Sequence, residues 1–439
     1  MANKNKHTPG MGGVFYKVAN VKTQAIIHIM NNKNIKSVSF GCRLNALESE
    51  KIQKMLSNHI NSAIVVNTCA VTAEAERQSG QAVRKIAREN PGVQIFVTGC
   101  AATRNPELFR NIPKCTVIHN ADKMNIDYYL SDKITLPYTE IKNIQNTDSK
   151  LSKKFIQIQN GCNHACTYCI TRALRGPAMS FEYENILQDI KDAVADGFYE
   201  IVLTGVDIAS YVQRDGDKVV LLSDLCKKLL MDVPEIQRLR LSSLDPAVPD
   251  IQNIIDLILQ EPRMMPHIHF SMQSGSDTIL KQMGRRHNAN MVRNLVQRAN
   301  NKISFSWDII CGFPGETDVL FNETLDLVRE LKPIKIHAFP FSPRPDTPAA
   351  SMPNQVNRAV SKQRVKIIND AANQNKTDFM RAQIGKTVSV LVEENNIARC
   401  PHDIAVKISG NIIRPKTICN VKLIDMCGDT FVGQVMLDK

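Results

Sequence analysis

The sequence predicts an α/β protein of three consecutive parts, the last of which is a small all-β barrel. At 439 residues the chain is too long for one ordinary hydrophobic core, so two or three domains are expected. From about residue 37 to residue 341, short apolar runs alternate with helical patterns, which is typical of parallel sheets. Beyond about residue 385 the pattern changes to short alternating strands separated by turns, which indicates the barrel.

The first 35 residues contain five lysines, no acidic residue and no clear period. We therefore expect residues 1–35 to form a disordered leader. The longest early apolar stretch, Ala25–Met30, is too short for a signal sequence or a membrane span, and no apolar run of 18 residues occurs in the chain. Together with the 12 cysteines, this predicts a protein of the reducing cytoplasm.

Residues 36–137 are expected to form a parallel α/β domain. Helical patterns cover about residues 46–56 and 72–89, and the run Asn90-Pro91-Gly92 ends the second of them. The strands that alternate with these helices are short, apolar and typical of a buried sheet. They are predicted at Ser37–Phe40, Ala63–Asn67 and Val93–Val97.

A cysteine closely follows each of these three strands, and we call Cys42, Cys69 and Cys100 the N-terminal triad. Ligands bind at the carboxyl edge of open α/β sheets, so three thiols from separate loops can converge there. The alternative is three buried small hydrophobic residues, which is what free cysteines usually are. The position of all three at strand ends favours a metal cluster.

Residues 138–153 are polar and lack a clear period, so we expect a linker. A partial, open barrel of six strand–helix units is predicted over residues 154–375, fewer than the eight of a full barrel. Such a barrel can admit a large substrate. Its strands are expected at Phe155–Gln159, Glu200–Thr204, Arg238–Ser242, His267–Met272, Ile303–Ile310 and Lys335–Phe341.

A helix over about residues 356–380 leads into the last part of the chain, residues 376–439. Its alternating strands are interrupted by turns such as Ser409-Gly410-Asn411. The predicted strands are 385–392, 405–408, 421–424 and 431–435.

A second set of cysteines has the spacing CxxxCxxC, and we call Cys162, Cys166 and Cys169 the barrel triad. Three thiolates on one short loop can hold three irons of a four-iron cluster and leave the fourth iron open to a ligand. Zinc sites usually pair a CxxC with a second pair elsewhere, and no such partner lies nearby. A disulfide is disfavoured because three is an odd number. The spacing therefore favours a catalytic iron–sulfur cluster over structural zinc.

Several blocks in both triad-bearing parts resemble the methylthiotransferase family of radical S-adenosylmethionine (SAM) enzymes. In the N-terminal part these blocks are Gly41–Asn45, Glu48–Glu50, Asn67–Val71 and Gly99–Ala101. The resemblance extends from about Ser37 to the end, and implies a three-cysteine domain, a central radical SAM barrel and a C-terminal TRAM domain. The blocks in the barrel are Leu203–Asp207, Leu241–Pro246, Ser271–Gly275, Asp308–Thr317 and Phe339–Ala349.

The resemblance implies two [4Fe-4S] clusters and SAM as cofactors. The family binds SAM at the open iron of the barrel cluster and cleaves it to a 5′-deoxyadenosyl radical, and it places an auxiliary cluster on the N-terminal triad. It also implies SAM contacts at Tyr168, Gly205, Gln273, Asp308 and Gly312. Each has an ordinary alternative: a core aromatic for Tyr168, turns for the glycines, and satisfied core polar groups for Gln273 and Asp308.

A nucleic-acid partner is compatible with the net charge of +12, although this excess does not demand one. The candidate RNA contacts are Arg285, Arg286 and Arg344, with Arg175 beside the cysteine loop. A charge run is more often a solvated face, so that alternative stays open for Arg285 and Arg286. TRAM domains are small RNA-binding barrels, which adds Lys386, Lys407 and Lys416 as phosphate contacts.

The reaction that the resemblance implies replaces the hydrogen on carbon 2 of an adenosine at position 37 of tRNA with a methylthio group. Within the family, N6-threonylcarbamoyladenosine, isopentenyladenosine and an aspartate of a ribosomal protein compete as substrates. Gly41–Asn45 and Phe341–Pro345 look most like the threonylcarbamoyladenosine branch. We further expect a reductant such as flavodoxin or ferredoxin, and a monomer. A rival of another class is a non-catalytic, zinc-binding RNA-binding protein.

Overall fold

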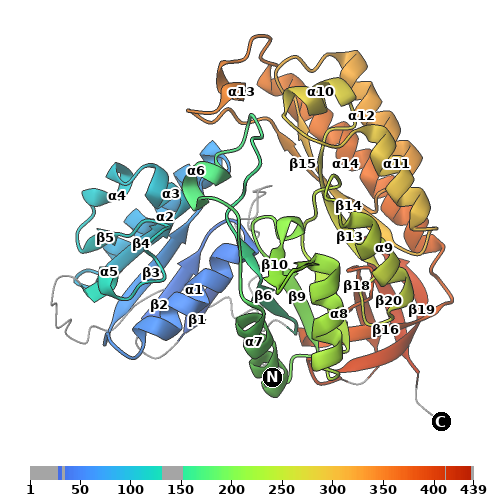
Figure 1. Ribbon diagram of the computed structural model, residues 1–439, viewed down its shortest axis with the longest axis horizontal. Coiled ribbons are helices and arrows are strands. Elements are labelled where there is room, and N and C mark those ends of the chain that lie inside the picture. The colour runs from blue at the N-terminus through green and yellow to red at the C-terminus, as the bar shows by residue number, and fades with distance from the viewer. Residues whose placement is uncertain (1–27, 32–34, 131–151, 411, 437–439) are drawn as a thin grey trace, which may run out of the picture.

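The computed structural model describes residues 28–31, 35–130, 152–410 and 412–436, and its three parts follow one another along the chain (Figure 1). A parallel α/β domain comes first, an open barrel of parallel strands lies in the middle, and a small closed β-barrel comes last. The predicted fold class is thus confirmed.

A five-stranded sheet forms the centre of the N-terminal part, in the order β1-β2-β3-β4-β5. Strands β2 to β5 run parallel to one another. Alternate residues of β3 face opposite sides of the sheet, so that Ile64 and Val66 pack into one core and Ala63 and Val65 into another. The strands are β1 (His28–Asn31), β2 (Ile35–Ser39), β3 (Ala63–Thr68), β4 (Ile95–Gly99) and β5 (Cys115–Val117).

Strand β1 lies inside residues 1–35, the predicted disordered leader, and pairs antiparallel with β2. The prediction is therefore wrong for residues 28–31. An edge strand needs only one neighbour and pairs through its backbone, so a polar composition without period does not exclude it. The rest of the predicted leader, apart from Ile35 in β2, lies outside the described residues.

Helices cover both faces of this sheet. Helix α2 begins after Thr72, whose side chain accepts a hydrogen bond from the Ala75 amide at 3.1 Å and so caps the first turn. Its buried side includes Val83 and Ile86, which pack on the sheet. The helices are α1 (Arg43–Leu56), α2 (Ala73–Glu89), α3 (Cys100–Arg104), α4 (Glu107–Arg110) and α5 (Asp127–Leu130).

The six predicted barrel strands are all present, as two three-stranded parallel sheets of order β12-β9-β6 and β13-β14-β15. Isolated bridges from Leu239 to Met264 and from Leu244 to Phe270 join the two sheets. The predicted linker falls, except for its last two residues, outside the described residues. The strands are β6 (Lys154–Gln157), β9 (Glu200–Thr204), β12 (Arg238–Leu241), β13 (His267–Gln273), β14 (Ser304–Cys311) and β15 (Lys335–Pro340).

Helices lie along the outside of these strands (Figure 1). Two short antiparallel strand pairs, β7 with β8 and β10 with β11, are additions to the strands predicted from the sequence. The main helices are α7 (Tyr183–Ala195), α8 (Leu222–Asp232), α9 (Ile251–Gln260), α10 (Asp277–Gln282), α11 (Ala289–Arg298), α12 (Asp318–Leu331) and α14 (Arg358–Arg381). The shorter elements are β7 (Gln159–Asn160), α6 (Thr171–Arg175), β8 (Met179–Ser180), β10 (Val212–Asp215), β11 (Lys218–Leu221) and α13 (Pro348–Ser351).

The C-terminal part closes into a barrel of order β16-β17-β18-β20-β19. Strand β17 is not predicted, because its three residues are too few to show alternation. Among the described residues, no helix is long and apolar enough to cross a membrane. The strands are β16 (Thr387–Val392), β17 (Ile397–Arg399), β18 (Ala405–Ser409), β19 (Ile418–Cys427) and β20 (Thr430–Val435).

The closed barrel docks on the amino ends of the central strands. Arg238 donates to the Ser389 carbonyl at 2.7 Å, and Arg240 donates to the Pro401 carbonyl at 3.1 Å. This leaves the carboxyl ends of the central strands, where ligands bind in such folds, to face the N-terminal part.

Candidate active site between two cysteine triads

The barrel triad lies on a loop that backbone contacts hold at both ends. The Cys162 amide donates to the Gly176 carbonyl at 3.1 Å, and the Thr167 amide donates to the Met283 carbonyl at 3.0 Å. Gly161 has a φ of +68°, and a side chain there would collide with the Pro177 carbonyl. The loop conformation is thus set by packing on the barrel.

The three thiols of this loop lie close enough to influence one another. Burial raises the pKa of Cys162 to about 11, and the neighbouring Cys169 and Cys166 act in the same direction. The Arg285 guanidinium lies 3.6 Å from the Cys166 sulfur. Three free thiols on one loop, with a hydrogen-bond donor at one sulfur, are a donor set that suits a four-iron cluster.

The N-terminal triad converges from three loops, as expected from its strand ends. Cys42 precedes α1, Cys69 follows β3 and Cys100 begins α3. Burial raises the pKa of Cys69 to about 12, and the proximity of Cys42 and Cys100 contributes in the same direction. Gly41, with a φ of +88°, admits the Cys69 sulfur, since an added Cβ would lie 2.5 Å from it. This donor set also suits a cluster.

A buried polar network connects the N-terminal triad to the loop of the barrel triad. Arg175, at the end of α6, donates to Glu48 at 2.9 Å and to Asn45 at 2.5 Å. Lys123 donates to the same glutamate at 2.6 Å, and the three charged side chains are at most 4% exposed. Asn120 lies 3.6 Å from the Cys100 sulfur. Burial would raise the pKa of Glu48, but Lys123 and Arg175 outweigh it and lower that pKa to about 2.

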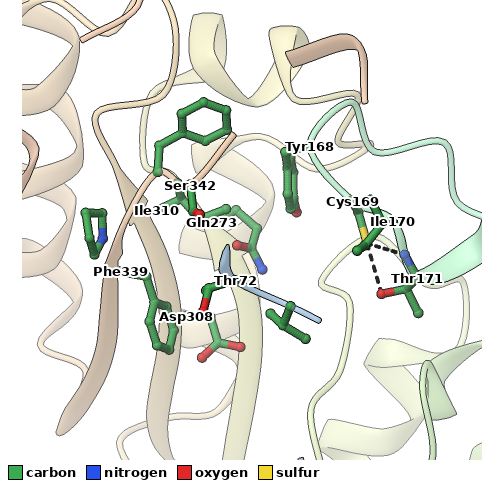
Figure 2. Close-up of a pocket in the computed structure, with 13 residues that line it drawn as sticks. Thr72, Tyr168, Cys169, Ile170, Thr171, Gln273, Asp308, Ile310, Phe339 and Ser342 are labelled. Carbon is green, nitrogen blue, oxygen red and sulfur yellow. Dashed lines mark hydrogen bonds between the residues drawn. The ribbon is translucent and has the colours of Figure 1, made fainter. Parts of the chain in front are cut away.

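A cavity of about 240 Å³ is lined by Cys169 of the barrel triad and by Val71 and Thr72, which follow Cys69 of the N-terminal triad (Figure 2). Figure 2 shows Gln273 and Asp308 turned into this space from the barrel strands, with Cys169 and Thr171 on its other side. Thr171 holds the Cys169 sulfur with its hydroxyl at 3.1 Å and its amide at 3.4 Å. The lining residues are Val71, Thr72, Tyr168, Cys169, Ile170, Thr171, Gln273, Asp308, Ile310, Phe339, Pro340, Phe341 and Ser342.

The cavity combines an aromatic wall with a few polar groups. Gln273 has a φ of +68°, at an irregularity in the pairing of β13 with β14, so its backbone is strained where it enters the cavity. Asp308 pairs with His269 at 3.1 Å. Phe339 is 38% exposed, which leaves a ring face free for a ligand. The cavity can therefore hold a planar aromatic group with polar edges.

Of the five predicted SAM contacts, Tyr168, Gln273 and Asp308 line the cavity and the two glycines do not. An added Cβ at Gly205 would lie 2.7 Å from the Gln159 carbonyl, and one at Gly312 would collide with Ser361. Internal packing thus accounts for both glycines without a ligand. Their role in SAM binding stays a prediction.

Three of the four predicted RNA-contacting arginines point into the protein, so that prediction is wrong for this arrangement. Arg175 pairs with Glu48, Arg344 pairs with Glu76, and both arginine side chains are at most 4% exposed. Arg285 is 7% exposed and contacts Cys166. The physical reason is that each guanidinium meets a buried acceptor from another part of the chain. Arg286, which is 51% exposed, stays a candidate.

Sequence reasoning missed the acidic partners of these arginines. Glu48 and Glu76 lie on the helices that follow Cys42 and Cys69, and both are buried. The sequence offered one signal, the glutamate at the start of the block Glu48–Glu50. The position of a glutamate on a helix does not show whether its carboxylate is buried in an ion pair or solvated.

Comparison with known proteins agrees with this arrangement. A protein-family model described as the radical SAM superfamily matches residues 156–328. A second family model, described as uncharacterized protein family UPF0004, matches residues 34–120. The threonylcarbamoyladenosine tRNA methylthiotransferase MtaB of Rickettsia prowazekii (strain Madrid E) is 40% identical over 394 residues, covering 87% of this chain and 93% of that protein. The tRNA-2-methylthio-N(6)-dimethylallyladenosine synthase of Rickettsia akari (strain Hartford) is 30% identical over 398 residues, covering 83% and 89%.

Among solved structures, the radical SAM methyltransferase TsrM from Kitasatospora setae covers 70% of this chain and 69% of its own, at 14% identity and a TM-score of 0.49. That likeness is too distant to bear on function. The relatives at 30–40% identity span nearly the whole chain and include both triads' domains. The chain therefore belongs to the radical SAM tRNA methylthiotransferases, enzymes for which the family implies a [4Fe-4S] cluster and SAM.

Proposed function

We propose that this enzyme methylthiolates carbon 2 of N6-threonylcarbamoyladenosine at position 37 of tRNA, with one [4Fe-4S] cluster on each cysteine triad. The observation that supports it is the shared cavity. Val71 and Thr72 follow a cysteine of the N-terminal triad, Ile170 and Thr171 follow one of the barrel triad, and all four line the same space. A base held there lies against segments that adjoin both triads.

When bound, the clusters and SAM supply the removal of hydrogen from an unactivated aromatic carbon, the sulfur and the methyl group. The chain's own residues bind and orient the base. Phe339 offers a stacking face, and such stacking is worth about 1–3 kcal/mol per base. Gln273 and Asp308 offer an amide and a carboxylate to the polar edge of the adenosine. Tyr168 packs edge-on against Phe313, which fixes the wall beside Cys169.

The choice of substrate rests on the relatives. The relative named for threonylcarbamoyladenosine is 40% identical, against 30% for the one named for dimethylallyladenosine, over similar lengths. The blocks Gly41–Asn45 and Phe341–Pro345 favour the same branch. The proposal includes electrons from a flavodoxin or ferredoxin, and a monomeric enzyme.

Mass spectrometry of tRNA nucleosides from a deletion strain tests the substrate. We expect the methylthio form of threonylcarbamoyladenosine to be absent while its parent remains. Loss of the isopentenyladenosine derivative would move the enzyme to the sister branch. An unchanged nucleoside profile with an altered ribosomal-protein mass would point to the aspartate substrate instead.

Iron content tests the two clusters. The chain reconstituted without oxygen should hold about eight irons, four per triad. Replacing the barrel triad by alanine should halve the iron and abolish SAM cleavage, whereas replacing the N-terminal triad should leave SAM cleavage but abolish the product. Full iron in either variant, or a native chain that prefers zinc, would contradict the proposal.

A further inference from the structure

Two buried ion pairs join the N-terminal part to the central barrel. In the first, Arg175 of α6 meets Glu48 of α1 at 2.9 Å. In the second, Arg344, which follows β15, meets Glu76 of α2. Both arginines come from the barrel part and both glutamates from the N-terminal part.

The two pairs have the same construction. Each glutamate is also held by a cation of its own domain, Glu48 by Lys123 at 2.6 Å and Glu76 by Arg104 at 2.9 Å. The acceptor is thereby oriented before the barrel arginine reaches it. Because the arginine adds a second charge-assisted contact to an oriented carboxylate, it fixes direction as well as distance.

Each end of each pair is connected by a short path to a cysteine or to the cavity wall. Glu48 and Glu76 lie on the helices that start after Cys42 and Cys69. On the barrel side, Arg175 ends the helix that follows Cys169. Arg344 follows the cavity-lining Phe341 and Ser342. A shift at either pair therefore moves one triad relative to the other.

Burial makes these contacts stiff. The Arg175 and Arg344 side chains are 4% and 3% exposed, whereas Lys51 and Asp189, which form another pair across the same interface, are 40% and 41% exposed. Exposed pairs are screened and contribute little, whereas losing one partner of a buried pair leaves an uncompensated charge. The exposed pair thus provides a matched control at the same interface.

We propose that Arg175 and Arg344 are positioning residues that set the separation and orientation of the two triads through Glu48 and Glu76. This inference rests on the proposed function, because it gives each triad a cluster. The hydrogen that one half-reaction removes and the sulfur that the other delivers must meet at one carbon. Misplacement of about 1 Å can cost about 100-fold in rate.

The first test needs no cofactor. In the apo protein, hydrogen exchange of Arg344→Met should accelerate in two segments, residues 70–76 and 340–347, while β9 exchanges as in the native chain. Arg175→Met should do the same near residues 42–48 and 171–176. Lys51→Met should leave all these segments unchanged. Native exchange in both arginine variants would overturn the inference.

The second test measures coupling in the reconstituted enzyme, as methylthio product per 5′-deoxyadenosine formed. Arg344→Met and Arg175→Met should keep native iron and SAM cleavage, but the product ratio should fall by about 10–100-fold. Arg344→Lys, which keeps a charge at Glu76, should recover part of it, and Lys51→Met should be native. A general folding defect would instead lower SAM cleavage and product together.

The outcomes separate this inference from the proposed function. A native chain with one cluster, or without methylthio product, would defeat the proposed function. If the native chain holds two clusters and the arginine variants keep the native ratio of product to 5′-deoxyadenosine, only the positioning role is wrong. Loss of iron in these variants would also contradict the positioning role, because it would assign the arginines to cluster assembly. If Arg344→Met does not fold, the product ratio of Glu76→Gln replaces it: a fall supports the positioning role, and a native ratio defeats it.

Discussion

At the scale of single residues, Gly41 shows how one missing atom lets the N-terminal thiols meet. Its φ of +88° is one that side chains rarely adopt, and an added Cβ would lie 2.5 Å from the Cys69 sulfur. Gly92 has the same φ of +88° but has nothing within 4 Å of an added Cβ. A substitution at Gly92 therefore tests the effect of backbone strain alone, whereas one at Gly41 also displaces the Cys69 thiol.

We expect Gly41→Ala to displace Cys69 and to lower the iron of the reconstituted chain by about half, with SAM cleavage retained and product lost. Gly92→Ala should cost about 1–3 kcal/mol of stability from the strained φ but keep the native iron. Iron analysis of both variants checks this. Native iron in Gly41→Ala would mean that the N-terminal triad binds no cluster or tolerates the shift.

Glu48 should stabilise the fold in a pH-dependent way. Its pKa is about 2 in the folded chain against an ordinary value of 4.5, so its ionisation contributes about 3 kcal/mol to the free energy of unfolding. That contribution is complete above pH 4.5 and is lost as the pH falls toward 2. Urea unfolding of the apo native chain and Glu48→Gln should show a difference that narrows over this window. A constant difference would contradict it.

At the scale of elements, the C-terminal barrel is part of the core structure and not an independent tail. Its loop between β17 and β18 carries Pro401 and Asp403, which receive Arg240 at 3.1 Å and Lys153 at 3.0 Å. Removing residues 384–439 should remove these two hydrogen bonds, each with a charged donor and worth about 1.5–3 kcal/mol, although Arg240 keeps its ion pair with Glu200. Urea unfolding of the truncated chain should show a destabilised central barrel. Native stability would show that the contacts contribute nothing.

RNA binding by this barrel is therefore better tested by point variants than by truncation. Lys386 and Lys407 are exposed. Replacing either lysine by alanine should reduce the slope of log affinity for tRNA against log salt concentration by about 1. Lys416 donates to the Asp196 carbonyl and lies 3.4 Å from the centre of the Phe198 ring. Lys416→Ala should leave the slope unchanged, and an equal effect of all three lysines would contradict this assignment.

At the scale of the whole molecule, two histidines enclosed by packing should make the apo chain sensitive to mild acid. Burial lowers the pKa of the buried His287 and of the partly buried His402 to about 4 in each case. The unfolded chain binds these protons near pH 6.5 and the folded chain only near pH 4, so stability should fall as the pH decreases between these values. In His402→Gln the fall should be shallower, as unfolding at several pH values would show. An identical slope would exclude this histidine.

How much of the site the sequence predicts depends on how far apart in sequence the contacting residues lie. Cys162, Cys166 and Cys169 lie on one loop, so their spacing alone predicts that they act together. Cys42, Cys69 and Cys100 are far apart in sequence, and only the rule for the edge of a parallel sheet brings them together before the structure does. Gln273 is the last residue of β13 and Asp308 lies within β14, and only the structure shows the strained backbone of Gln273.

The sequence by itself determined the three-part α/β fold, the six barrel strands and the two triads. These follow from local periodicity, from the spacing of the barrel triad and from the rule for the edge of a parallel sheet. Only the tertiary structure decided which way the arginines point. Arg175 and Arg344 read as RNA contacts in the sequence, yet each meets a buried glutamate from another domain. An isolated positive charge cannot distinguish phosphate from a distant carboxylate, because that choice is made when the domains dock and water is excluded from between them.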